Sequence, residues 1–149
     1  MTIRRLPAFG TGAGRQEGMT YQEEIKKLKQ EKQAVILAHY YVRPEIQEVA
    51  DYIGDSFYLS KLAQGLKNPV IVYCGVNFMG ESGKLLSPGK QVLMPDMEAD
   101  CPMAHMVTRE EVQKYRDEYE ALAVVCYINS TAEIKTWSDV CVTSANAVR

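Results

Sequence analysis

The chain has 149 residues, of which 46% are hydrophobic and 24% are charged, a composition typical of a globular protein. Its formal net charge of −2 leaves no basic excess, which argues against nucleic acid or an anionic membrane surface as a partner. The longest apolar runs, such as 34–38 and 121–126, are too short to cross a bilayer, so we expect a soluble protein.

Residues 1–19 contain several arginines and glycines but no hydrophobic segment of the kind found in secretory signals. We predict a disordered tail here, with an organelle transit peptide as the alternative. Without a secretory signal, disulfides are not expected, and a reducing cytoplasm is the expected location.

The next segment predicts a helix followed by a buried strand. Thr20 and Glu23 have the spacing of a capping box, which opens a helix through about residue 33. The apolar run 34–38 does not alternate with polar residues, as expected for a strand of a parallel sheet that is buried on both faces. Later helices and apolar strands alternate in the same way, which predicts an α/β fold with a parallel sheet between helix layers. The predicted segments are a helix from Pro44, a strand at 70–74, a helix at 78–86 and a strand at 91–94.

The chain also resembles itself after a shift of 88 residues. The shift places Thr20 on Thr108, each three residues before a glutamate, and it places Asp51 on Asp139. Order and spacing of this kind indicate an internal duplication. We therefore predict a first α/β/α domain at 20–107 and an incomplete second copy at 108–149.

Polar side chains follow the first predicted strand of each copy. His39 and Tyr41 come after the run 34–38, and Tyr127 and Asn129 occupy the matching place in the second copy. Ligands of parallel α/β sheets bind beyond the carboxyl ends of strands, so these four side chains are candidates for a pocket that takes a small anion. The alternative is that the tyrosine rings cover the core and His39 is a surface histidine.

Ser56 and Ser144 each precede a predicted helix, where a serine can serve as the N-cap. The same position also suits a hydroxyl that binds a carboxylate or phosphate at a helix N-terminus. The residues alone leave both roles open.

The four cysteines are spaced without any CxxC pair. Cys74, Cys126 and Cys141 fall within predicted strands, where cysteine commonly behaves as a small buried apolar residue. Cys101 differs because it ends a polar loop after a strand, where a thiolate could face a cavity. One cysteine is by itself a weak indication of metal binding.

Several of these motifs together resemble the quinolinate synthase family, and the resemblance runs from about residue 20 to the last residue. The motifs are Ala38-His-Tyr-Tyr41, Gly54-Asp-Ser56, Gly75-Val-Asn-Phe-Met-Gly-Glu81, Leu93–Cys101, Tyr127-Ile-Asn-Ser130 and Val142-Thr-Ser144.

The resemblance implies a cytoplasmic enzyme of NAD biosynthesis with three α/β/α domains around one active site. Such an enzyme condenses iminoaspartate, the product of L-aspartate oxidase, with dihydroxyacetone phosphate to give quinolinate, phosphate and water. It carries a [4Fe–4S] cluster on three cysteines, with one iron open as a Lewis acid.

Carried over residue by residue, the resemblance makes Cys101 one of the three cluster ligands. It makes Tyr41 and His39 catalytic residues, with Tyr41 the better candidate to assist proton transfer. The resemblance also implies a set of substrate-binding residues: His39, Ser56, Tyr127, Asn129 and Ser144.

The other two cluster cysteines of the family have no counterpart in these 149 residues. We therefore expect this chain alone to be an inactive fragment of quinolinate synthase. The alternative is a stand-alone or inactive α/β module that binds a small anion and lacks a cluster.

Overall fold

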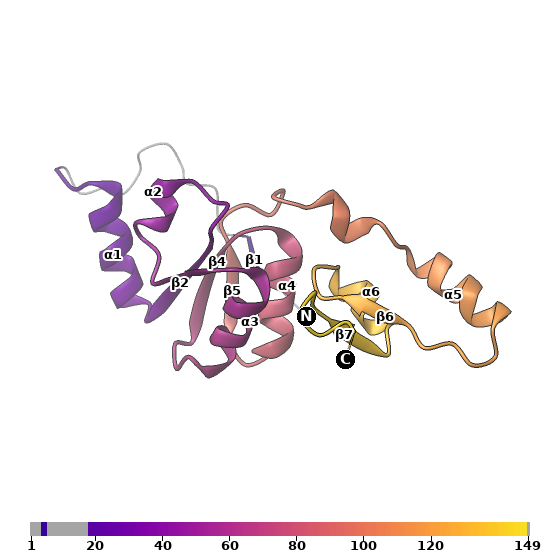
Figure 1. Ribbon diagram of the computed structural model, residues 1–149. Helices are drawn as coiled ribbons and strands as arrows, with labels where there is room; N and C mark the ends of the chain where they lie inside the picture. The colour runs from indigo at the N-terminus through magenta and orange to yellow at the C-terminus, as the bar shows by residue number, and fades with distance from the viewer. Residues whose placement is uncertain (1–3, 6–17, 149) are drawn as a thin grey trace. The chain divides into compact units, whose positions relative to one another are not determined.

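The computed structural model describes residues 4–5 and 18–148, which belong to two compact units (Figure 1). Unit 1 is Met1–Ala99 and unit 2 is Asp100–Arg149, so the structural division comes eight residues before the predicted boundary at 107/108. Most of the predicted tail at 1–19 lies outside the described residues. Within it, Arg4–Arg5 form the short strand β1.

Unit 1 alternates strands and helices along the chain. Its further elements are α1 (Tyr21–Glu31), β2 (Ala34–His39), α2 (Pro44–Gln47), β3 (Tyr52–Gly54), α3 (Ser56–Gly65), β4 (Val70–Cys74), α4 (Asn77–Leu86) and β5 (Gln91–Met94).

The strands of unit 1 form one sheet in the order β1-β5-β4-β2-β3, and every neighbouring pair is parallel. Helices precede or follow the strands on both sides of the sheet (Figure 1). This arrangement confirms the predicted α/β class with a parallel sheet between helices.

One face of this sheet packs against α3 and α4. Leu37, Tyr73 and Met94 point to this face and are completely buried. A side chain at Gly80 would place its Cβ 2.3 Å from Met94 Sδ, so glycine lets α4 approach the sheet closely. Burial of side chains of this size contributes about 1.5–3 kcal/mol each, which makes this face the main core of unit 1.

The opposite face of the sheet packs against α1 and α2. Ile36, Ala38, Val49 and Cys74 form a buried cluster there. Next to this cluster is a cavity of about 650 Å³, lined mostly by apolar side chains of α1, α2 and strands β2, β4 and β5. The helices of unit 1 therefore divide between the two faces, with α1 and α2 on one and α3 and α4 on the other.

Asp51 connects the start of the sheet to α1. Its Oδ2 accepts the Ile36 N–H at 2.8 Å, and its Oδ1 accepts from Lys29 Nζ at 2.8 Å. The Thr20 and Glu23 capping box is present as predicted, because Thr20 N–H donates to Glu23 Oε2 at 2.8 Å and Glu23 N–H donates to Thr20 Oγ1 at 3.3 Å.

Unit 2 has a smaller sheet, in which β6 and β7 are paired in parallel. Its elements are the 3₁₀ helix η1 (Pro102–His105), α5 (Arg109–Glu118), β6 (Val125–Tyr127), α6 (Ala132–Thr136) and β7 (Val140–Val142).

Two local features of unit 1, the capping box and the aspartate that binds a backbone amide and a helix cation, recur in unit 2 at positions 88 residues later. Thr108 and Glu111 form a second capping box before α5. Asp139 Oδ2 accepts the Val124 N–H at 2.8 Å and Arg116 Nη2 at 3.0 Å, as Asp51 does with a strand amide and a helix cation. These correspondences support the predicted duplication, which itself stays a prediction.

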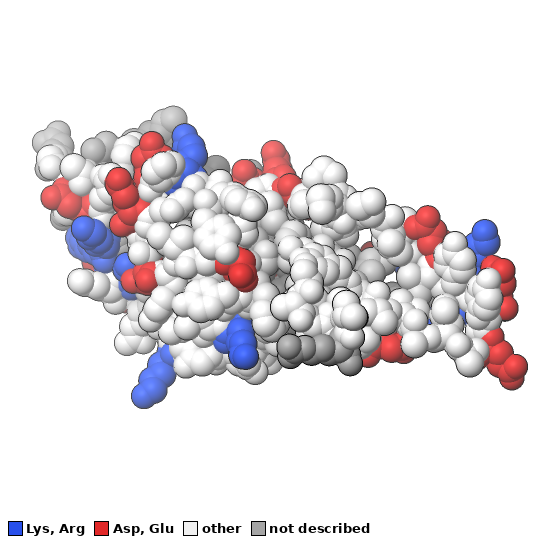
Figure 2. All heavy atoms as spheres, in the orientation of Figure 1, with Lys and Arg blue, Asp and Glu red and all other residues white. Residues whose placement is uncertain are grey.

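Figure 2 shows acidic and basic side chains next to one another over α1 and over α5, the two helices that open with capping boxes. Over residues 4–5 and 18–148, no helix is long and apolar enough to cross a membrane.

Candidate functional site

The connections in unit 1 diverge at one point on the carboxyl edge of the sheet. β2 and β4 are neighbours, and Ala38 pairs with Cys74 near the carboxyl end of each strand. The chain leaves β2 toward α2 on one face and leaves β4 toward α4 on the other. Adjacent strands with diverging loops form a topological switch point, the usual ligand site of a parallel sheet.

His39 is the last residue of β2 and stands at this switch point, half-buried. Its Nδ1 accepts the backbone N–H of Tyr41 at 3.2 Å. Burial lowers the pKa of His39 below its usual value, against the opposing influence of Asp55. The imidazole is therefore neutral at pH 7 and, with Nδ1 occupied as an acceptor, carries its proton on Nε2.

Tyr41 lies in the turn after β2, with 89% of its surface exposed. Its ring meets the His39 ring edge-on at a centroid distance of 4.6 Å, and Tyr40 contacts both rings. Tyr41 and Tyr127 are both exposed, which argues against the alternative in which these tyrosine rings cover the core. A hydroxyl on such an accessible ring is free to meet an incoming ligand.

Ser56 reaches the same edge from β3, because His39 pairs with Gly54 two residues before it. The interpretation of Ser56 as an N-cap is wrong. Asp55 is the N-cap of α3, and its side chain accepts the Tyr58 N–H at 2.7 Å. Ser56 is the first residue of the helix, and its hydroxyl remains available for another partner.

Gly75 lies beside His39, at the start of the loop that leaves β4. A Cβ at this position would meet Met79 Sδ at 2.9 Å and would lie 3.7 Å from His39 Cβ. Glycine therefore lets the Met79 side chain pack against the backbone beside His39. Neither Gly75 nor Asn77 was assigned a role from the sequence, although the motif 75–81 directly after a buried strand marks them.

Unit 2 brings Tyr127 and Ser144 together, from the ends of its two paired strands. Tyr127 Oη and Ser144 Oγ are 3.1 Å apart, and both residues are exposed. Asn129 follows β6 by two residues and is partly buried. The two adjacent hydroxyls form a neutral pair of donors and acceptors that suits a carboxylate or a phosphate.

Ser144 is not the N-cap of a helix among the described residues, because turns follow it through Val148. Thr143 takes the local capping contacts instead, since its N–H and Oγ1 donate to Asn146 Oδ1 at 2.6 Å and 3.1 Å. The Ser144 hydroxyl is therefore directed to Tyr127 and not to backbone amides.

The four thiols lie in different surroundings and none is in a disulfide. Burial raises the pKa of the Cys74 thiol to about 11, which disfavours the thiolate that a metal requires. Cys126 is buried in β6, and burial and the neighbouring Cys126 raise the pKa of Cys141. Cys101 is partly exposed before η1, where its N–H donates to Asp100 Oδ1 at 2.8 Å.

The described residues do not form a complete metal site by themselves. Nowhere in residues 4–5 and 18–148 do three or more His, Cys, Asp or Glu side chains gather as a metal site. A [4Fe–4S] cluster needs several thiolates, so these residues do not fit a complete cluster site. Cys101 fits as one ligand of a larger set.

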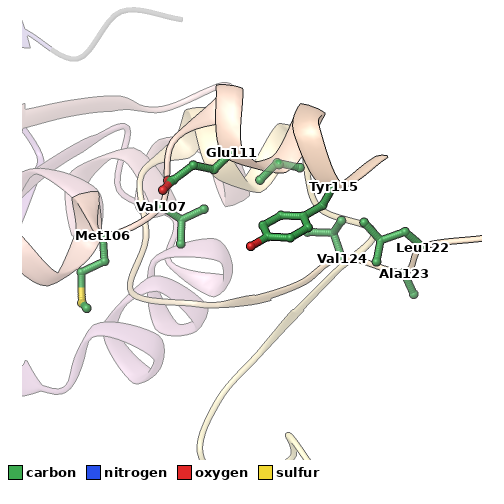
Figure 3. Close-up of a pocket in the computed structure, with 8 residues that line it drawn as sticks. Met106, Val107, Glu111, Tyr115, Leu122, Ala123 and Val124 are labelled. Atoms are coloured by element: carbon green, nitrogen blue, oxygen red, sulfur yellow. The ribbon is translucent and has the colours of Figure 1, made fainter. Parts of the chain in front are cut away.

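A second pocket lies within unit 2, between α5 and the segment before β6 (Figure 3). The volume of this pocket is about 330 Å³, and most of the side chains that line it are apolar. In Figure 3 the ring of Tyr115 projects between Val107 and Val124, while the Glu111 carboxylate is already bound by Thr108. None of the predicted site residues lines it.

The chain matches the family model described as Quinolinate synthetase A protein over residues 23–149. It is 61% identical to quinolinate synthase from Fusobacterium nucleatum over 128 residues, which cover 86% of this chain and 43% of that protein. A Clostridium perfringens quinolinate synthase is 58% identical over 129 residues, covering 87% of this chain and 43% of the relative. The Clostridioides difficile quinolinate synthase is 57% identical over 131 residues, which cover 88% of this chain and 42% of that protein. The chain therefore spans less than half the length of these relatives.

Proposed function

The chain belongs to the quinolinate synthetase A protein family, and from that premise we propose that it forms the amino-terminal part of an enzyme that makes quinolinate for NAD biosynthesis. The proposed reaction condenses iminoaspartate, supplied by L-aspartate oxidase, with dihydroxyacetone phosphate. The observation that carries the proposal is the match over residues 23–149 together with a polar edge of the sheet at its topological switch point.

The neutral imidazole of His39 supports a role as a hydrogen-bond donor. Its Nδ1 is occupied by the Tyr41 N–H, so Nε2 can donate to a substrate carbonyl or carboxylate oxygen without first gaining a proton. Tyr41 is exposed beside it and is our candidate for assisting proton transfer. We assign both residues as catalytic and expect the ring contact to orient the phenol.

Hydroxyl groups are our candidates for binding the substrate's acidic groups. Ser56 supplies a hydroxyl at the first turn of α3, where the helix dipole favours an anion. Tyr127 and Ser144 supply two more hydroxyls 3.1 Å apart, and Asn129 adds an amide. We propose that these four residues bind carboxylate or phosphate groups.

Cys101 is our proposed ligand to a [4Fe–4S] cluster, with the remaining thiolates supplied by residues outside this sequence. When bound, such a cluster supplies a Lewis-acidic iron. Cys101 is the candidate because its thiol is partly exposed in a polar loop, whereas Cys74 is buried. A ligand thiolate also requires reducing conditions, which fits a cytoplasmic enzyme.

The proposal is tested by substituting cysteines in a complete family enzyme that contains this segment. We expect Cys101→Ala to lose the broad iron–sulfur absorbance, to retain far fewer than about four irons per chain after anaerobic reconstitution, and to lose quinolinate formation. Cys141→Ala is the matched control and should keep the cluster. An intact and active cluster in Cys101→Ala would refute the ligand role of Cys101.

A further inference from the structure

Two cysteines face each other across the small sheet of unit 2. Cys126 is the middle residue of β6 and Cys141 is the middle residue of β7, and the two are direct partners in the register of these parallel strands. Partners in register point to the same face of a sheet, and their backbones lie about 4.8 Å apart. This spacing falls within the range of about 4.4–6.8 Å between Cα atoms that a disulfide spans.

The two thiols differ in their access to solvent. Cys141 is exposed, so a reagent in solution reaches its sulfur first. Cys126 is buried, and its Sγ donates to the Tyr127 carbonyl at 3.3 Å. Burial raises the pKa of the Cys141 thiol, and the nearby Cys126 thiol raises it further, so thiol exchange at pH 7 is slow.

We propose that Cys126 and Cys141 form a redox-active dithiol site, which a low-molecular-weight disulfide such as oxidised glutathione converts to a cross-strand disulfide. The Cys141 thiolate attacks one sulfur of the reagent and releases one glutathione thiolate. The Cys126 thiolate then attacks Cys141 Sγ in the mixed disulfide and releases the second glutathione. Overall, the two cysteines lose two electrons and two protons, and one glutathione disulfide becomes two thiols.

The bond would connect the strands that carry the candidate anion-binding hydroxyls. Tyr127 follows Cys126 directly, and Ser144 comes soon after Cys141. A disulfide would therefore restrain the two residues whose hydroxyls lie 3.1 Å apart. This consequence rests on the proposed function, whereas formation of the bond does not. In a reducing cytoplasm the bond would be transient, because reduced glutathione reverses it.

The test equilibrates the 149-residue chain with mixtures of reduced and oxidised glutathione, then blocks the free thiols and identifies the bonded cysteines by mass spectrometry. The series is run in buffer and again in concentrated urea. Cys126→Ser and Cys141→Ser each remove one partner of the pair. Cys101→Ser is the matched control, because Cys101 is also a partly exposed cysteine of unit 2 that lies outside both strands.

We expect a bond between Cys126 and Cys141 whose equilibrium constant is about tenfold or more higher in buffer than in urea, because the sheet holds the thiols in register. Cys101→Ser should form the same bond, and neither of the other variants should form an internal bond. In the oxidised chain the Ile128 amide, which donates to the Val142 carbonyl at 2.8 Å, should exchange about tenfold more slowly.

An equal equilibrium constant in buffer and in urea would overturn the proposal, because the fold would then not bring the two thiols together. Glutathione adducts without an internal bond would overturn it as well. The comparison of buffer with urea uses no substitution, so it does not depend on the folding of the variants. None of these measurements needs a cluster or a substrate, so an intact cluster in Cys101→Ala would refute the proposed ligand role and leave the dithiol site standing.

Discussion

Units 1 and 2 begin with similar local hydrogen bonds but differ in how many apolar side chains they bury. In each unit a capping box opens a helix, and an aspartate then binds a backbone amide in or just before the next strand and a cation from that helix. Unit 1 continues into a five-stranded sheet with a core on both faces. In unit 2 the described strands number two, and the buried apolar side chains are Ala104, Val112, Cys126 and Ile134.

The comparison teaches that local hydrogen bonds do not determine stability by themselves. The capping boxes and the two aspartates have nearly the same geometry, with the Ile36 and Val124 amides each 2.8 Å from the aspartate oxygen. Only in unit 1 does the strand amide belong to a core residue, Ile36, with apolar side chains packed around it. The same contact is therefore shielded from water in unit 1 and open to it in unit 2.

The largest difference is expected for side chains in the two cores. Leu37→Ala should lower the free energy of unfolding of unit 1 by about 3 kcal/mol, because Leu37 is completely buried in the central strands. Ile134→Ala should cost less, about 1–2 kcal/mol, because the surroundings of Ile134 can collapse around the change. Urea unfolding followed by residue-resolved hydrogen exchange measures both values. A larger loss of unfolding free energy for Ile134→Ala than for Leu37→Ala would contradict this expectation.

A smaller difference is expected for the two aspartates. Asp51→Ala leaves the Ile36 N–H without its acceptor and should destabilise unit 1 by about 1 kcal/mol, discounted for partial exposure. Asp139→Ala should have a weaker effect, because 50% of the Asp139 side chain is exposed against 31% of the Asp51 side chain. Exchange rates of the Ile36 and Val124 amides report the two contacts separately. Equal acceleration in both variants would show that burial does not strengthen the contact.

The smallest expected effect is a pH dependence confined to unit 1. Burial lowers the pKa of His39, so the unfolded chain binds its proton more tightly than the folded chain. The resulting stability is complete above the unfolded pKa of about 6.5 and is lost as the pH falls toward the folded pKa.

Position 127, the predicted counterpart of position 39 in unit 2, is a tyrosine and not a histidine. His39→Gln should therefore remove this slope of stability between pH 7 and 5 from unit 1 and leave the exchange of unit 2 amides unchanged. Urea titrations at several pH values provide the measurement. If the pH dependence of stability persists in His39→Gln, another titratable group causes it.

Much of unit 1 could be predicted because its signals are local. The strands at 70–74 and 91–94 have the predicted bounds, and the capping boxes follow from a spacing of three residues. The short strand β3 was not predicted, because its three residues have no periodicity that distinguishes them from a loop. Strand β3 forms because the hydrogen bond from Ile36 to Asp51 and the pairing with β2 place its residues beside β2.

The sequence alone determined the α/β class and family, and it selected the polar residues that follow the strands, because each depends on residue types at fixed spacing. The tertiary structure decided which of those residues are neighbours. It made Asp55 the N-cap in place of Ser56, paired Tyr127 with Ser144, and directed the Asn77 amide to Met97. The Asp55 cap is a local contact, but the other two join residues 17 and 20 positions apart, whose neighbourhood depends on strand order and packing that no local pattern encodes.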